Sequence, residues 1–205
     1  MAVTGQGARQ LKRLERLMDV VFALVIWRMF TMLPRPNPDD LQWDSVVEML
    51  VSEWARFVVP VIGILIVVIY WLQNNALFSR LRATDAVHTG ISMFQLFFLL
   101  FFLYAIGVGL RVEAAADTRA FESAAAALVG LAAYLGWWYA RRKGGLVAPE
   151  VSPEEAAAIS KRNLAEPITA VLTIPFAFVG PIAWELSWFL YPGLRYLLGR
   201  WQRRG

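Results

Sequence analysis

The chain has 205 residues, of which 58% are hydrophobic and 18% are charged, and its mean hydropathy is +0.49. A soluble domain of this size is typically about 45–50% apolar and about 25% charged. The chain contains no cysteine and one histidine, His88, which excludes a disulfide framework, a thiol nucleophile and a Cys/His zinc site. The composition therefore excludes a soluble enzyme and indicates a protein that spans a membrane.

Six apolar segments follow one another along the chain. A helix crosses the hydrocarbon core of a bilayer with about 17–25 apolar residues. The fifth segment is short and contains Pro175, and the Gly180-Pro181 pair marks a turn before the sixth. The sequence therefore predicts an all-α membrane protein, one domain over 1–205, with spans at about 17–33, 57–72, 91–110, 120–140, 168–180 and 182–198.

The basic residues predict the orientation of these spans. With the N-terminus inside and six spans, fourteen Lys and Arg residues lie in inside segments and four in outside segments. Loops on the cytoplasmic side carry such an excess of Lys and Arg. Because both ends of the chain are basic, the number of spans is predicted to be even and both termini cytoplasmic.

Two stretches outside the spans also have helical patterns. Residues 46–54 repeat apolar side chains at helical spacing, which predicts a helix at the membrane interface. The acidic residues in and before it leave open a second interpretation, an acidic vestibule that concentrates cations; they are Asp40, Asp44, Glu48 and Glu53. Ser152-Pro153 followed by two glutamates resembles a helix N-terminus, and it predicts a short cytoplasmic helix that ends near Arg162.

Small residues recur four apart in the fourth span. Ala126 and Gly130 form one such pair, and Ala132 and Gly136 form another. This spacing allows a neighbouring helix to approach closely, so we expect it to serve packing.

Arg28 is the least expected residue inside a span. Leu24, Arg28 and Thr31 share one face of the first helix at i, i+4 and i+7. Glu185 in the sixth span lies at a similar depth from the outer surface, and either charge alone costs roughly 2.5–3.5 kcal/mol to insert. We therefore predict an ion pair between Arg28 and Glu185, within a subunit or between subunits.

Nothing in the sequence supports catalysis. His88 has only Asp85 as a nearby acidic partner, an arrangement more typical of a structural histidine. No phosphate-binding loop, zinc-protease helix or nucleophile elbow is present in the sequence. The prediction is a protein that is not an enzyme and needs no metal or organic cofactor.

Two stretches of the chain carry recognisable motifs. Residues 13–19 read RLERLMD, and residues 70–75 read YWLQNN and are followed by Phe78, Arg82 and Asp85. The first stretch resembles the Arg-x-x-x-Phe-Ser-Asp motif that opens the first helix of the transmembrane protein 175 family, the lysosomal potassium channels and their bacterial relatives, and the second resembles the junction between that family's second and third helices. The resemblance implies a homo-tetramer in which the first helices line an ion path through the cell membrane, here a bacterial inner membrane.

The resemblance also implies roles for individual residues. The family's constriction positions fall on Leu24, Arg28 and Thr31. A polar network that holds the helices at the cytoplasmic end is implied for five further positions: Arg13, Asp19, Asn74, Asn75 and Asp85.

The sequence departs from the family pattern at the constriction and in the motifs. Arg28 replaces an apolar constriction residue, Leu17-Met18 replace the motif's Phe-Ser, and Asn74-Asn75 replace a histidine pair. Three functions therefore stay open: a potassium-permeable, leak-type channel with K⁺ or other monovalent ions as its partners, an anion-permeable or non-conducting homologue because of Arg28, and a membrane scaffold. Arginines around one axis repel cations and favour anions. No nucleic-acid partner is expected, because the basic residues lie in short clusters between apolar runs.

Overall fold

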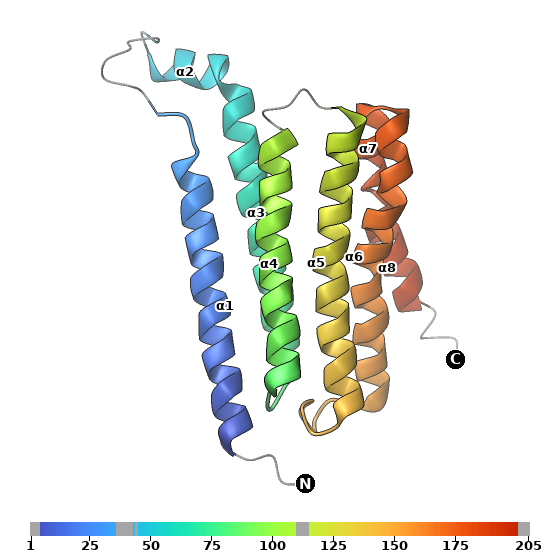
Figure 1. The fold of residues 1–205 in the computed structure, drawn as a ribbon. Helices are drawn as coiled ribbons and strands as arrows, with labels where there is room; N and C mark the ends of the chain where they lie inside the picture. Colours follow the sequence, from blue (N-terminus) through green and yellow to red (C-terminus); the bar gives the residue numbers. More distant parts are fainter. Residues whose placement is uncertain (1–4, 36–42, 44, 110–114, 201–205) are drawn as a thin grey trace. The chain divides into compact units, whose positions relative to one another are not determined.

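The computed structural model describes residues 5–35, 43, 45–109 and 115–200. Helices make up nearly all of these residues, and no strand occurs in the ranges described. The predicted all-α class is confirmed. The helices are α1 (Gly5–Thr31), α2 (Val46–Ser52), α3 (Trp54–Phe78), α4 (Ala86–Gly109), α5 (Ala116–Lys143), α6 (Pro153–Val179), α7 (Pro181–Ser187) and α8 (Leu190–Arg200) (Figure 1).

The helices group into two compact units. The first unit comprises residues 1–14 and 77–205, and the second comprises residues 15–76. In the first unit, α4, α5 and α6 lie side by side with α5 in the middle, and α7 and α8 pack against α6 (Figure 1). The second unit contains most of α1, all of α2 and most of α3.

Helix α5 packs closely because it presents small residues. A Cβ atom added to Gly130 would lie 2.8 Å from Cδ and 3.0 Å from the backbone nitrogen of Pro167 on α6. Ala126 and Ala132 are buried on the same helix. The expectation that the small residues of this segment serve packing is therefore confirmed at Gly130.

Two loops at one end of the first unit are joined by backbone hydrogen bonds. Arg82 N donates to Leu146 O at 2.8 Å, and Ala148 N donates to Arg80 O at 2.9 Å. The Nε of Arg82 also donates to Gly145 O at 2.8 Å. These bonds fix the loop before α4 against the loop between α5 and α6.

Helix α6 corrects one prediction. Ser152 does cap the helix, since its Oγ accepts a hydrogen bond from Glu155 N at 3.1 Å, and Pro153 begins the helix as expected. The helix does not end near Arg162, however, but continues to Val179 through Pro167 and Pro175. Proline inside a helix removes one backbone hydrogen bond, which neighbouring helices can compensate in a membrane protein. The predicted cytoplasmic helix and fifth span are therefore parts of one helix.

The segment predicted as the sixth span is broken. Helix α7 ends at Ser187 and α8 begins at Leu190. Between them, Trp188 N donates to Glu185 O at 3.3 Å and Phe189 N donates to Leu186 O at 3.1 Å. Pro192 explains the break, because it has no N–H to offer the carbonyl of Trp188 and its ring clashes with that carbonyl.

Two of the described helices, α4 and α5, are long and apolar enough to cross a membrane by length and composition. The part of α3 from Gly63 to Phe78 is apolar but shorter. The membrane crossing of the remaining segments stays a prediction.

Candidate functional site

Helix α1 has an apolar face that the chain leaves uncovered. The four side chains Leu17, Val20, Leu24 and Trp27 recur at alternating three- and four-residue spacing and are each roughly half exposed or more. Leu24 is 60% exposed and Trp27 is 63% exposed. The other apolar face of the same helix is buried and consists of Leu11, Leu14, Met18, Phe22 and Val25. Helix α1 therefore carries two apolar faces, of which the chain covers one.

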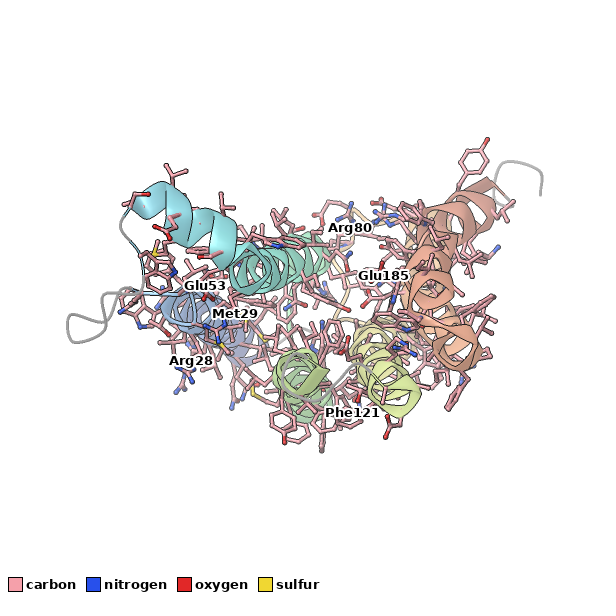
Figure 2. The ribbon with its side chains drawn as sticks, turned by 90° about the horizontal axis from the view of Figure 1, so that it is seen from above. Arg28, Met29, Glu53, Arg80, Phe121 and Glu185 are labelled. Carbon is pink, nitrogen blue, oxygen red and sulfur yellow. The ribbon has the colours of Figure 1, made fainter. Side chains whose placement is uncertain are left out.

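The three predicted constriction residues lie on or beside the exposed face. Arg28 is exposed, and Figure 2 shows its side chain pointing away from α2 and α3. Met29, the next residue, points the other way, and its Sδ would lie 2.7 Å from a Cβ atom added to Gly63 of α3. Thr31 is half-buried, and its Oγ1 donates to the backbone oxygen of Arg28 at 2.7 Å. At roughly 100° per residue, Arg28 and Thr31 lie within about 40° of Leu24 around the helix.

Asp19 connects α1 to α3 within the second unit. The Nε1 of Trp71 donates to Asp19 Oδ1 at 2.9 Å. Trp71 belongs to the motif at residues 70–75, but no sequence pattern identifies Asp19 as its partner. Among the other residues of the predicted network, Arg13 and Asn75 are exposed, whereas Asn74 is buried and bonded. The roles implied for Arg13, Asn74 and Asn75 stay predictions.

Asp85 caps α4 and joins it to α5. Its Oδ1 accepts from His88 N at 2.9 Å, and its Oδ2 accepts from the Tyr139 hydroxyl at 2.8 Å. Partial burial raises the pKa of the Asp85 carboxyl, but the hydrogen bonds from His88 and Tyr139 and the charges of Lys143 and His88 outweigh it and lower the pKa below its usual value.

His88 behaves as a structural residue. It is buried, and its Nδ1 lies 2.8 Å from Thr84 Oγ1, while its ring packs 6.1 Å from that of Phe78. A hydroxyl partner and an aromatic neighbour satisfy a buried imidazole without a ligand. No group of three or more His, Cys, Asp or Glu side chains that could hold a metal occurs within the described ranges.

Arg119 has a role that the sequence analysis missed. It is one of the four basic residues that the predicted orientation assigns to outside segments, and it lies in the first turn of α5 and is 9% exposed. Its Nε and Nη2 donate to the backbone oxygen of Ala177 on α6, at 3.2 and 3.0 Å. An arginine shortly after an acidic residue such as Asp117 is common both in loops and in the first turns of helices. The sequence alone therefore does not show that Arg119 contacts another helix.

A buried hydroxyl cluster joins α5, α6 and α7 one helical turn beyond Arg119 along α5. Ser123 Oγ accepts from Thr173 Oγ1 and from Trp184 Nε1, each at 2.8 Å. Ser123 and Thr173 are fully buried. These residues carried no sequence signal, because serine and threonine are frequent on both buried and exposed faces of helices.

The predicted Arg28–Glu185 pair is not tested by the structure of one chain. Both side chains are exposed, and they belong to different units. The pairing stays a prediction.

Comparison with known proteins connects these features to one family. The family model of the endosomal/lysosomal potassium channel TMEM175 matches residues 13–102, which include most of α1, all of α2 and α3, Asp85 and most of α4. A potassium channel of Streptomyces collinus is 27% identical over 175 residues, which are 82% of this chain and 82% of that protein.

Two solved structures have a similar fold. The crystal structure of a lysosomal potassium-selective channel TMEM175 homolog from Chamaesiphon minutus aligns with a TM-score of 0.67 and 16% identity, over 95% of this chain and 97% of that chain. A variant of the potassium channel MtTMEM175, in complex with a nanobody–MBP fusion protein, aligns with a TM-score of 0.67 and 18% identity, over 94% of each chain.

The matches agree with one another along the chain. The sequence match begins at the motif in α1 and continues through the α3–α4 junction, where the resemblance was seen. The structural matches extend the likeness to nearly the whole chain. The matched family is one of membrane channels and not of enzymes. This chain is therefore similar over residues 13–102 to the family of the endosomal/lysosomal potassium channel TMEM175, and over nearly its whole length it has the fold of the two solved channels.

Proposed function

We propose that the protein is a potassium-permeable, leak-type channel of a bacterial cell membrane. Four copies would surround one ion path, each with six spans and both termini in the cytoplasm. The match of residues 13–102 to a potassium channel family and the similarity to the potassium channel of Streptomyces collinus support the activity and the conducted ion. The fourteen-to-four distribution of basic residues supports the orientation.

The observation that carries the proposal is the exposed face of α1. In a bilayer, an apolar face alone could contact lipid, because lipid is as apolar as leucine. Arg28 lies beside this face, one turn from Leu24, and an arginine that faces lipid costs roughly 2.5–3.5 kcal/mol on insertion scales. The face is therefore better placed against other subunits and water than against lipid.

Leu24 is the best candidate for the narrowest point. Four leucines around an axis form an apolar ring, and hydrophobic constrictions gate ion flow by dewetting. Arg28 lies one turn closer to the end of α1, about 6 Å along the axis at 1.5 Å per residue. We place Arg28 and Thr31 at the mouth of the path and Leu24 at its constriction.

The exposure of Arg28 supports a second candidate function. If four Arg28 guanidinium groups point into the path, they repel cations, and the assembly would pass anions or stay closed. Pairing with Glu185 would neutralise these groups. The two functions therefore differ in where Arg28 points and in what neutralises it.

The deciding measurement is the reversal potential of the purified protein in a planar bilayer under a KCl gradient. A reversal potential near the K⁺ equilibrium potential supports the potassium channel. A value near the Cl⁻ potential supports the second candidate, and Arg28→Leu should then move it toward K⁺. A folded tetramer by native mass spectrometry that carries no current contradicts both and favours a membrane scaffold.

The predicted ion pair has its own test. Glu185→Gln is expected to lower the melting temperature in detergent, because it leaves Arg28 unpaired. Adding Arg28→Leu should restore part of the loss. If the double variant is as unstable as the two single changes together, the pairing is wrong.

A further inference from the structure

Three arginines from three elements gather in the first unit. Arg80 lies in the loop after α3, Arg162 on α6 and Arg195 on α8. Helix α8 packs against α6, and Arg80 forms an ion pair with Glu155 of α6, so these arginines lie on elements that meet at α6, where the charges of Arg195 and Arg80 act on Arg162. We call these three residues the arginine cluster.

Two of the three arginines have partners of different kinds. Arg80 Nε forms an ion pair with Glu155 Oε1 of α6 at 3.2 Å. Arg195 Nη1 donates to the hydroxyl of Tyr191 at 3.0 Å, and its guanidinium lies 5.9 Å from the centre of the same ring. Neither the hydroxyl nor the ring carries a full negative charge.

Arg162 lies on α6, the helix that contacts both other elements. It is seven residues after Glu155, which places it two turns further along the same face of α6. Its guanidinium makes no hydrogen bond or ion pair with any residue that the structure describes. The guanidinium of Arg162 is therefore the one to which an anion could bind without displacing a described partner.

Helix α8 adds an apolar surface beside these charges. It has eleven residues and exposes Leu190, Tyr196 and Leu197, while Arg195 is also exposed. Short helices with a basic face and an apolar face lie at the membrane interface. Basic groups between helices at that level bind the headgroups of anionic lipids.

Phosphate fits the cluster better than carboxylate or chloride does. A guanidinium presents a planar fork of donors that matches two oxygens of a phosphate, and within the part of the chain that the structure describes Arg162 has no acceptor for its fork. A phospholipid would also place its acyl chains on the apolar side chains of α8. A free phosphate would leave that surface uncovered.

We propose that the arginine cluster and α8 bind one anionic phospholipid, with its phosphate on Arg162 and Arg195 and its acyl chains along Leu190 and Leu197. Arg80 contributes charge while it stays paired with Glu155. The bound lipid would hold α8 against α6.

The test measures the binding of short-chain phosphatidylglycerol to the purified full-length protein in a neutral detergent, with phosphatidylcholine and inorganic phosphate as the other two probes. Removing one arginine near a membrane surface is expected to weaken the binding of an anionic lipid about fivefold. We therefore expect Arg162→Gln and Arg195→Gln each to weaken phosphatidylglycerol binding about fivefold, and Arg162→Lys to keep part of the affinity.

Arg142→Gln is the matched control. It removes one exposed arginine from the end of α5, where Arg142 lies 4.7 Å above the ring of Trp138 and outside the cluster. We expect it to bind phosphatidylglycerol within about twofold of the unchanged protein. A circular dichroism spectrum of each variant shows whether the helices are retained.

Three outcomes would overturn the proposal. One is equal binding of phosphatidylglycerol by the unchanged protein and by folded Arg162→Gln. Another is equal affinity for phosphatidylcholine and phosphatidylglycerol. The third is competition by inorganic phosphate at equal concentration, which would assign the cluster to a soluble anion.

Discussion

Helices α5 and α1 have nearly the same length, 28 and 27 residues, but the chain covers them very differently. Helix α5 lies between α4 and α6 and buries eleven residues, small and polar ones among them. Helix α1 buries one apolar face and exposes the other, from Leu17 to Trp27. The packing of α5 is thus complete within one chain, whereas that of α1 is not. This difference is the physical argument that α1, and not α5, meets other copies of the chain.

The largest expected effect separates the two faces of α1. Because the chain has no cysteine, a single cysteine can be introduced without background reaction. Leu24 is 60% exposed and its neighbour Val25 is 7% exposed. We expect a charged thiol reagent to abolish nearly all current through Leu24→Cys and to leave the current through Val25→Cys unchanged, measured in the same planar bilayers.

This pair of variants also distinguishes pore from lipid. A charged reagent reacts with a thiol in water and not with one in hydrocarbon. If Leu24→Cys carries current but does not react, its face contacts lipid, and the comparison between α1 and α5 loses its functional meaning.

The second effect concerns a buried charge in α5. Arg119 donates two hydrogen bonds to the oxygen of Ala177, and hydrogen bonds that involve a charged group contribute about 1.5–3 kcal/mol. We expect Arg119→Met to reduce the free energy of unfolding by about that amount, measured by denaturant unfolding in detergent micelles.

Arg56→Gln is the control for Arg119→Met. The side chain of Arg56 is 75% exposed and pairs with Glu53 at 2.9 Å, so its loss should change the stability by about 0.5 kcal/mol or less.

The third effect tests the close packing of α5. In Gly130→Ala, the new Cβ would lie 2.8 Å from Pro167 Cδ, so one helix must move. Overpacking of this kind costs about 1–3 kcal/mol. Gly107→Ala on α4 is the control, because nothing lies within 4 Å of its added Cβ, and its melting temperature should not fall. Equal melting temperatures for the two variants would contradict the close approach of α5 and α6.

The sequence predicted those parts of the fold that depend on local patterns. The apolar runs gave the all-α class, and the Ser152-Pro153 signal gave the start of α6, because both depend on neighbouring residues. The same reasoning could have predicted the break before α8, since Pro192 acts on Trp188 four residues earlier. The sixth span was predicted from its apolar residues alone, and Pro192 lies inside that apolar segment.

Long-range partners could not be predicted in this way. The bonds from Arg119 to Ala177 and from Trp71 to Asp19 join residues 58 and 52 positions apart. No pattern in one sequence specifies which helix faces which. The α1 positions Leu24, Arg28 and Thr31 came from a resemblance together with helical spacing, and the exposure of Leu24 and Arg28 is the structural feature that supports them.

The smallest expected effect concerns the cap of α4 and its dependence on pH. Replacing an N-cap aspartate by alanine costs about 1 kcal/mol, and Asp85→Ala also removes the acceptor for Tyr139. The folded protein lowers the pKa of Asp85 below its usual 3.8, so the charged carboxylate contributes stability above that pH. This contribution is lost as the pH falls through the lowered pKa. We therefore expect the stability difference between the unchanged protein and Asp85→Ala, measured by denaturant unfolding, to be constant from pH 7 to about 5 and to shrink below about 4.

Tyr139→Phe keeps the cap and removes one hydrogen bond to Asp85, so it should show a smaller stability difference with the same dependence on pH. A difference that stays constant into acid would mean that the shape of the aspartate, and not its charge, holds α4 to α5.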